Sequence, residues 1–346
     1  MALLREPAAA AQEAGPPAVA SRPAGRWKKA VRLAAVVASL GFLAALVISQ
    51  WQELRAFPWT LRPAWLVLSL GGLLAAWLVE LSIWRFLLAG VGGALSWRRA
   101  AQVWFYSNLV RYIPGNIWQF LGMAELAADS GVGRLTTFTS IALHQALSTA
   151  VGLVVAAVYF AAAGQGALLE AVRPALWLVP LGLVFCHPRL LEWLLNQALR
   201  LLRRPPVQVT LTWQQVAAAL LGYLGVWLIM GGAFALLAAS VTSVGRAEAP
   251  ALVATWAAAY VIGYLSLLTP SGLGVREGVM VLLLTPILPA PAPTVVALAA
   301  RLWMVAGELL GVALAVLLGR RRGAEEALPP PVRHEADREA SQEAQA

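Results

Sequence analysis

The chain has 346 residues, of which 60% are hydrophobic and 12% charged, and its mean hydropathy is +0.71. Several apolar runs are long enough to span a bilayer and no series of short alternating segments indicates a β-barrel, so we expect an all-α polytopic membrane protein. The net charge of +9 is explained by basic cytoplasmic flanks without nucleic acid, and the single cysteine, Cys186, excludes a disulfide framework or a thiolate metal site.

The first half of the chain contains three apolar spans and one interrupted stretch. Residues 1–25 are rich in Ala, Pro and Gly, which predicts a disordered cytoplasmic tail. Residues 100–128 are apolar but are broken around Pro114, and each arm is too short to cross a membrane alone. We therefore expect a re-entrant pair of half-helices there. The continuous spans of this half are predicted over 31–50, 64–90 and 136–163.

The second half repeats this order. The segment 174–195 is the weakest predicted span because Pro180 and Pro188 interrupt it, and the arginine-bearing residues 196–213 are predicted to form a cytoplasmic connector. Residues 251–289 form the second broken element. The remaining spans are predicted over 216–241 and 294–318, followed by a disordered acidic tail over 323–346.

The distribution of basic residues predicts the orientation. Fourteen Lys and Arg residues flank the spans on the side of the amino terminus. Only four lie on the opposite side, and by the positive-inside rule both termini are cytoplasmic, in a bacterial-type plasma membrane. Two full crossings in place of each hairpin would leave this count unchanged. The four outer residues are Arg55, Arg62, Arg173 and Arg246.

The repeated order also predicts how the membrane domain is built. We expect a single membrane domain over 26–322 with about six to eight transmembrane helices and two broken or re-entrant elements. Its halves, about 31–163 and 174–318, enter the membrane from opposite sides. Transporters with inverted repeats place their substrate site near the midplane, where interrupted helices face each other.

Both breaks carry a recognisable motif. Residues 111–115 read Arg-Tyr-Ile-Pro-Gly, and residues 269–278 read Thr-Pro-Ser-Gly-Leu-Gly-Val-Arg-Glu-Gly. These segments resemble the two signature segments of the flippase-like membrane domain family, which includes the membrane half of lysylphosphatidylglycerol synthases. The resemblance covers about residues 31–318 and implies movement of a lipid or lipid-linked molecule between leaflets. This chain is similar to the stand-alone form, since no soluble transferase domain follows residue 322.

The breaks supply most of the candidate substrate-binding residues. An arginine's planar guanidinium suits phosphate oxygens, and glycines let a ligand approach the main chain. In the last span, Arg301 and Glu308 are two helical turns apart, share a face, and are expected to pair with Glu277 and Arg276 respectively. The candidates are Arg111, Pro114, Gly115, Asn116, Pro270, Gly272, Gly274, Arg276, Glu277, Arg301 and Glu308.

Two further ionisable residues lie inside predicted spans. Glu80 is costly at that depth without a partner, and Arg85 is poorly placed on the same helix, so we expect its partner on another helix. His144 stands with Gln145 where the family resemblance leads one to expect a charged pair. Either a hydrogen-bonded interior histidine or a proton-relay role fits this position.

The function predicted from these features is translocation of a phospholipid or lipid-linked headgroup between leaflets, with membrane lipids as the partners. One alternative is a non-transporting scaffold for a lipid-modifying transferase. A weaker alternative is an intramembrane hydrolase that uses Ser271 and His144. We expect no enzyme activity, catalytic residue, metal or cofactor, because the few histidines and aspartates form no convincing constellation.

Overall fold

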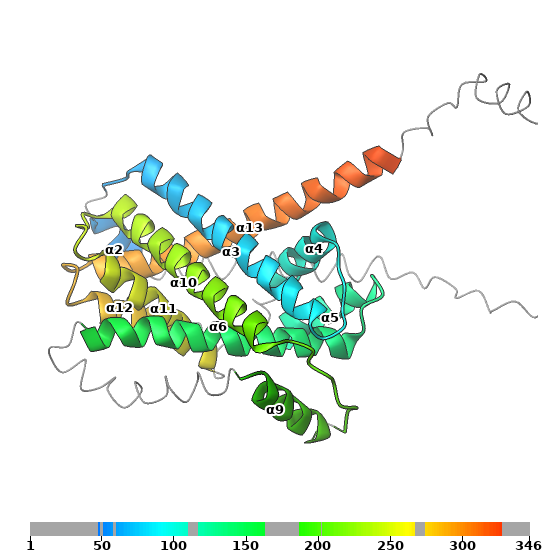
Figure 1. The fold of residues 1–346 in the computed structure, drawn as a ribbon. Helices are drawn as coiled ribbons and strands as arrows, with labels where there is room; N and C mark the ends of the chain where they lie inside the picture. The colour runs from blue at the N-terminus through cyan, green and yellow to red at the C-terminus, as the bar shows by residue number, and fades with distance from the viewer. Residues whose placement is uncertain are drawn as a thin grey trace, which may run out of the picture.

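The computed structural model describes residues 48, 51–57, 60–109, 117–162, 187–201, 203–266 and 274–326. Within these ranges every regular element is a helix (Figure 1). Four helices are long and apolar enough to cross a membrane, which confirms the multi-pass, all-α class. They are α3 (Pro63–Ala89), α6 (Arg134–Ala162), α10 (Trp213–Val241) and α13 (Ala292–Glu326), the last with its apolar part ending at Gly319.

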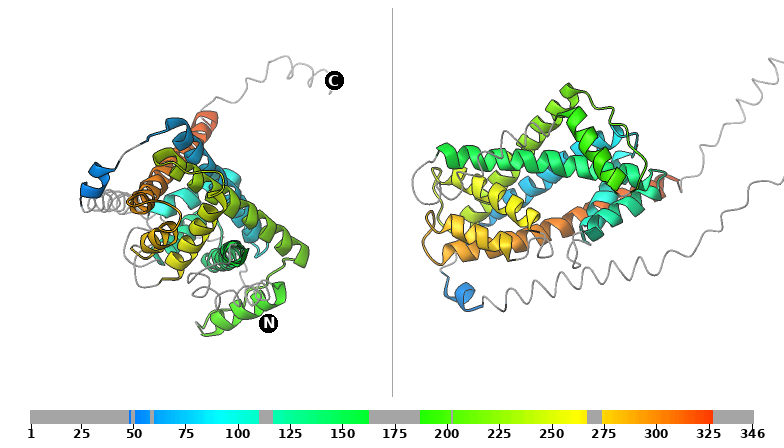
Figure 2. Two further views of the ribbon diagram at one scale, coloured as in Figure 1. Left: turned by 90° about the vertical axis from the view of Figure 1, so that its left-hand side faces the viewer. Right: turned by 90° about the horizontal axis from the view of Figure 1, so that it is seen from below.

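The helices α3 and α10 lie side by side and antiparallel, with extensive contact along their length (Figures 1 and 2). At one end the Arg62 amide donates to the Ser240 carbonyl at 2.9 Å, and at the other end the Thr210 amide donates to the Gly90 carbonyl at 3.0 Å. Between them the helices pack closely, because a Cβ on Gly72 would lie only 2.9 Å from that of Ala233. Small residues at such a seam let two backbones approach in a membrane.

The first broken element folds into an antiparallel hairpin of α4 (Trp97–Asn108) and α5 (Ile117–Ala128). The Gln119 amide donates to Asn108 Oδ1 at 2.7 Å next to the break, and Arg99 Nη2 donates to the Leu126 carbonyl at 3.2 Å at the open end. The prediction of two short arms around residues 111–116 is therefore confirmed. The first arm begins earlier than predicted, at Trp97, because Ser96 caps it by accepting from the Arg99 amide.

The second broken element consists of α11 (Ala249–Leu265) and α12 (Val275–Leu284), which also contact each other. The end of α11 lies against the start of α12, since a Cβ on Gly263 would be 2.8 Å from Arg276 Cβ. Gly274 begins α12 with a φ of +79°, a conformation that other residues adopt only with strain. The predicted break is confirmed, and α12 returns the chain to the start of α13.

The contacts of the two broken elements are matched. In the first hairpin, α4 packs against α13 and α5 packs against α6. In the second hairpin, α11 packs against α6 and α12 packs against α13. When α3, α4, α5 and α6 are exchanged for α10, α11, α12 and α13, every helix pair with extensive contact among the described residues maps onto another such pair. The pattern of contacts between helices is therefore the same for the two halves of the sequence.

Other predicted boundaries differ from the structure. The predicted end of a span at residue 195 is wrong, because α9 (Pro188–Leu201) begins at Pro188, where a proline is favourable, and continues through residue 195. The helix α13 continues to Glu326, beyond the predicted end at residue 318 and into the predicted tail. A short helix, α2 (Trp51–Ala56), precedes α3. Residues 1–47 and 327–346, and with them almost all of the predicted first span and both tails, lie outside the described residues, as do residues 163–186.

We predict that Gly231→Ala destabilises the bundle, whereas the adjacent Gly232→Ala does not. A Cβ on Gly231 would be 2.9 Å from the Cα of Val253 on α11, and backbone cannot move aside cheaply; Gly232 has no such neighbour within 4 Å. The first change should lower the free energy of unfolding by about 1–3 kcal/mol. The second should leave it unchanged or raise it by up to about 1 kcal/mol through helix propensity. Thermal unfolding in one detergent measures both, and equal losses would contradict this account of the α10–α11 contact.

Candidate functional site

A polar cavity lies at the meeting point of both broken elements and three of the long helices. Its empty volume, including its open mouth, is about 1190 Å³. The lining residues come from α3, α4, α5, α6, α10, α11 and α12, so both halves of the sequence contribute. They include two ionisable groups of opposite sign, Glu80 and Arg276, together with amides, hydroxyls and three tryptophans.

The cavity is deep within the bundle. Glu80, His144 and Trp227 are each at least nine residues from either end of their helices. At 1.5 Å per residue this distance is about 13 Å or more along the helix axis. Charged and polar side chains at that depth of a membrane protein are expensive and are commonly part of a substrate or ion pathway.

One wall of the cavity holds a carboxylate, an imidazole and a phenol from three helices. His144 Nε2 on α6 is 3.6 Å from Glu80 Oε1 on α3, and His144 Nδ1 is 2.6 Å from the hydroxyl oxygen of Tyr223 on α10. The indole of Trp104 on α4 packs edge-on against the imidazole, with ring centroids 5.2 Å apart. The expected partner of Glu80 on another helix is thus confirmed, and Arg85 instead donates to the Leu95 carbonyl at 2.7 Å.

The opposite wall is built around Glu277. Its Oε1 is 3.6 Å from Arg276 Nη2 and 3.7 Å from Arg301 Nη1, while its Oε2 accepts from the Gly274 amide at 2.8 Å. One carboxylate therefore caps α12 and links it to α13. Arg276 is 5% exposed and its guanidinium carbon lies 5.8 Å from the ring centroid of Tyr260, which also lines the cavity.

The two candidates on α13 have different outcomes. The predicted pair of Arg301 with Glu277 is confirmed. Arg276 was expected to pair with Glu308 but lies beside Glu277, the next residue on its own helix. Arg301 and Glu308 are both 2% exposed and neither lines the cavity, so they support its wall rather than face a ligand.

The remaining predicted site residues divide into two groups. Gly274 is described, and its place is structural, because it begins α12 and donates to Glu277. The others lie in the two breaks, outside the described residues, and their proposed contact with substrate stays a prediction. They are Arg111, Pro114, Gly115, Asn116, Pro270 and Gly272.

Several cavity residues were not found by sequence reasoning. Asn108 and Gln119 bond to each other across the first break, and Gln145 donates to Thr149 at 3.3 Å on α6. Tyr223 is fully buried and bonds to His144. Polar residues next to a helix break can indicate a binding site. Asn108 and Gln119 have this position in the sequence, but the same pattern is also typical of residues that only bond to the backbone of a break. Tyr223 gave no signal, since a tyrosine in an apolar span is equally typical of packing.

In the hydrolase alternative, His144 is paired with Ser271. Both of its ring nitrogens face other groups, Tyr223 and Glu80, and Ser271 lies outside the described residues. Within the described part of the chain no three His, Cys, Asp or Glu side chains gather as a metal site. Comparison of the chain with models of known protein families and with curated proteins finds no match.

We predict that Glu277→Gln strongly destabilises the protein. The change leaves Arg276 and Arg301 buried without the carboxylate between them, and breaking one side of a buried ion pair costs about 3–5 kcal/mol. Glu125→Gln is the matched control, because Glu125 pairs with Arg134 on the surface, where ion pairs contribute little. Thermal unfolding should fall sharply for the first variant and stay near wild type for the second. Equal stability of both variants would show that Glu277 does not hold the wall together.

Proposed function

We propose that the protein is a lipid translocase that moves a phospholipid or lipid-linked headgroup between leaflets, as a flippase-like membrane domain. The observation that carries this proposal is the polar cavity at bundle depth, lined by both broken elements and by groups of opposite charge. A headgroup that crosses hydrocarbon without partners loses its hydration, and a cavity with an arginine, amides and hydroxyls replaces part of it.

In this proposal Arg276 receives the phosphate. Its guanidinium is fixed by Glu277 and by the face of Tyr260, and a pre-oriented planar fork suits two phosphate oxygens. The amides of Asn108 and Gln119 are placed to bond glycerol or sugar oxygens on the other side of the cavity. Acyl chains remain in lipid outside the bundle, so that only the headgroup requires a polar route.

An inverted repeat accounts for the contacts of the helices. Because α3 and α10 are antiparallel, a two-fold axis that exchanges them is perpendicular to both helices and therefore lies in the membrane plane. The matched contacts of the two halves support this symmetry. The α4–α5 and α11–α12 hairpins then enter from opposite faces and meet at the cavity, as the broken helices of other inverted-repeat transporters do.

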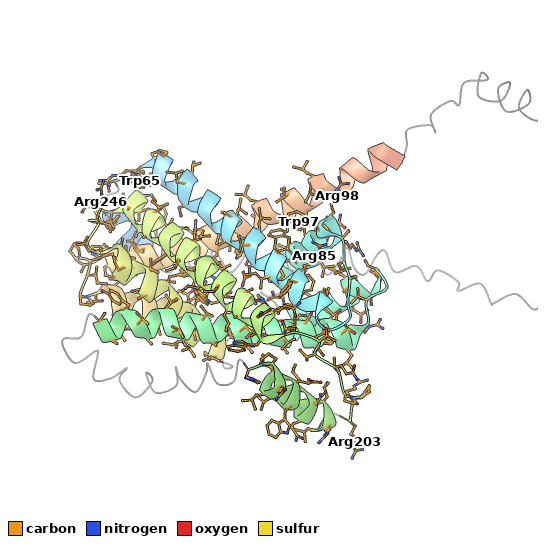
Figure 3. The ribbon with its side chains drawn as sticks, viewed as in Figure 1. Trp65, Arg85, Trp97, Arg98, Arg203 and Arg246 are labelled. Carbon is orange, nitrogen blue, oxygen red and sulfur yellow. The ribbon has the colours of Figure 1, made fainter. Side chains whose placement is uncertain are left out.

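The positions of basic side chains support cytoplasmic termini in a plasma membrane. Arg98 begins α4 and Arg203 follows α9, near the end of the bundle where α3 ends and α10 begins. Arg246 lies at the other end, close to the start of α3 (Figure 3). The predicted cytoplasmic and outer arginines therefore separate along the helix axes.

We predict opposite labelling of Arg203→Cys and Arg246→Cys in a Cys186→Ser background. Both native side chains are exposed. Arg203 precedes the start of α10 and Arg246 follows its end, so they lie at opposite ends of this helix. In intact cells a membrane-impermeant maleimide should label position 246 and should label position 203 only after the membrane is opened. Labelling of both positions from outside would contradict the orientation, and the same reagent on opened cells controls for reactivity.

We predict that purified protein in liposomes accelerates exchange of a fluorescent phospholipid between leaflets and that Arg276→Ala slows this exchange about tenfold or more. Loss of a charge-assisted bond to phosphate costs about 1.5–3 kcal/mol. Arg276→Lys should recover part of the rate, because charge returns without the planar fork. Arg246→Ala is the matched control, since Arg246 is exposed and far from the cavity.

The measurement is the rate at which dithionite bleaches NBD-phosphatidylglycerol of the inner leaflet, at equal protein per vesicle. Exchange no faster than in empty vesicles would favour the alternative of a non-transporting scaffold for a transferase. Equal slowing by Arg276→Ala and Arg246→Ala would show that translocation does not depend on the cavity.

A further inference from the structure

Two acidic side chains with very different surroundings lie close to Arg276 or line the cavity with it. Glu277 is held between the guanidinium groups of Arg276 and Arg301. Glu80 lines the cavity itself and has a titratable neighbour in His144, 3.6 Å away. A carboxylate can gain and lose a proton, unlike a guanidinium, so the charge of Glu80 responds to protons.

Both ring nitrogens of His144 face a neighbouring group. Nδ1 is 2.6 Å from the Tyr223 hydroxyl oxygen, and Nε2 is 3.6 Å from Glu80 Oε1. Trp104 packs on one edge of the ring and Tyr223 on another, so the ring is held in place. Glu80 and His144 both line the cavity and Tyr223 does not, so the carboxylate is open to a proton from the cavity.

The other helices around His144 bring few competing charges. The cavity-lining residues of α4 and α5 are uncharged and include Asn108 and Gln119, and α11 contributes the phenols Tyr260 and Tyr264. The ion pair of Glu125 on α5 with Arg134 on α6 is on the surface. Among the described residues that line the cavity, the remaining charged side chain is Arg276 on α12.

We propose that Glu80 and His144 form a proton-binding site whose occupancy is coupled to an anionic headgroup at Arg276, so that lipid and proton cross together. The inference rests on the proposed translocase function and adds its coupling ion. When Glu80 is charged, its negative charge repels an anionic headgroup in the cavity that Arg276 also lines. When Glu80 is protonated, this repulsion is removed and an anionic phosphate binds more tightly at Arg276.

The proton balance of the cycle is simple. One proton from water on one side binds a carboxylate oxygen of Glu80 and forms an O–H bond, while His144 stays neutral. The headgroup and this proton then face the other side, where the O–H bond breaks and the proton returns to water as the lipid leaves. Linkage requires that the headgroup raises proton affinity by the same factor by which the proton raises headgroup affinity.

The test uses the full-length protein in vesicles of phosphatidylethanolamine and phosphatidylglycerol with trace NBD-phosphatidylglycerol. Exchange is measured from about pH 5.5 to about pH 8, a range in which a buried carboxylate can titrate. We expect the rate to fall with rising pH, approaching tenfold per pH unit where one proton is required. A pH gradient should enrich labelled lipid in the leaflet facing the alkaline side, with proton entry reported by trapped pyranine.

The decisive variant is Glu80→Gln, which has the shape of the protonated acid but cannot titrate. Whatever its residual rate, the ratio of its rates at low and high pH should collapse to about one. Glu125→Gln removes a surface carboxylate and should keep the wild-type ratio. Tyr223→Phe removes the bond that fixes the imidazole and should shift the midpoint of the pH profile without removing the dependence.

A second readout does not need transport. Infrared difference spectra of wild type between the two pH limits should contain the C=O stretch of a protonated carboxylic acid, and Glu80→Gln should lack it. The inference would be overturned if the exchange rate depended on Na⁺ and not on pH, or if Glu80→Gln left the pH profile of the rate unchanged. In either case the translocase proposal would stand. If no lipid exchange occurs at any pH, the translocase proposal fails, and the infrared band alone decides whether Glu80 is a proton site.

Discussion

The structure depends on pairing the charges that are buried inside the helix bundle. Glu277 lies 3.6 and 3.7 Å from two arginines and accepts from one backbone amide, and through these contacts it links α12 to α13 next to the second break. Across the cavity, Glu80, His144 and Tyr223 connect α3, α6 and α10 in the same manner. In a medium that supplies no water, each unpaired group would cost several kcal/mol, so these contacts decide which helices are neighbours.

Close helix packing is the second constraint, and it explains why the charges can meet. A Cβ on Gly311 of α13 would lie 2.3 Å from the Phe105 ring of α4, and one on Gly152 of α6 would lie 2.6 Å from the Trp227 ring of α10. In hydrocarbon the hydrophobic effect does not drive helices together, so this intimate packing supplies much of the attraction. It also draws the ends of the short helices toward the middle of the bundle, where the cavity forms.

The proposed transport follows from these two constraints. Two hairpins, each packed against a long helix of the other half, give a cavity whose walls belong to different halves. A small rocking of one half against the other would open one side of such a cavity and close the other. The rigid Glu277 cluster then presents a constant positive group to the headgroup, and the Glu80–His144 pair supplies a group whose charge changes during the cycle.

The sequence by itself determined the all-α membrane class, the two breaks and most helix limits, because hydropathy and prolines act locally. It also indicated that Glu80 needs a partner elsewhere and that Arg301 meets Glu277. It could not identify His144 or Tyr223 as the partners on the other wall, nor reveal that Glu277 holds both arginines. Those pairings are fixed by which helix faces meet and at what height, and that choice depends on glycine contacts and antiparallel registers between residues far apart in the chain.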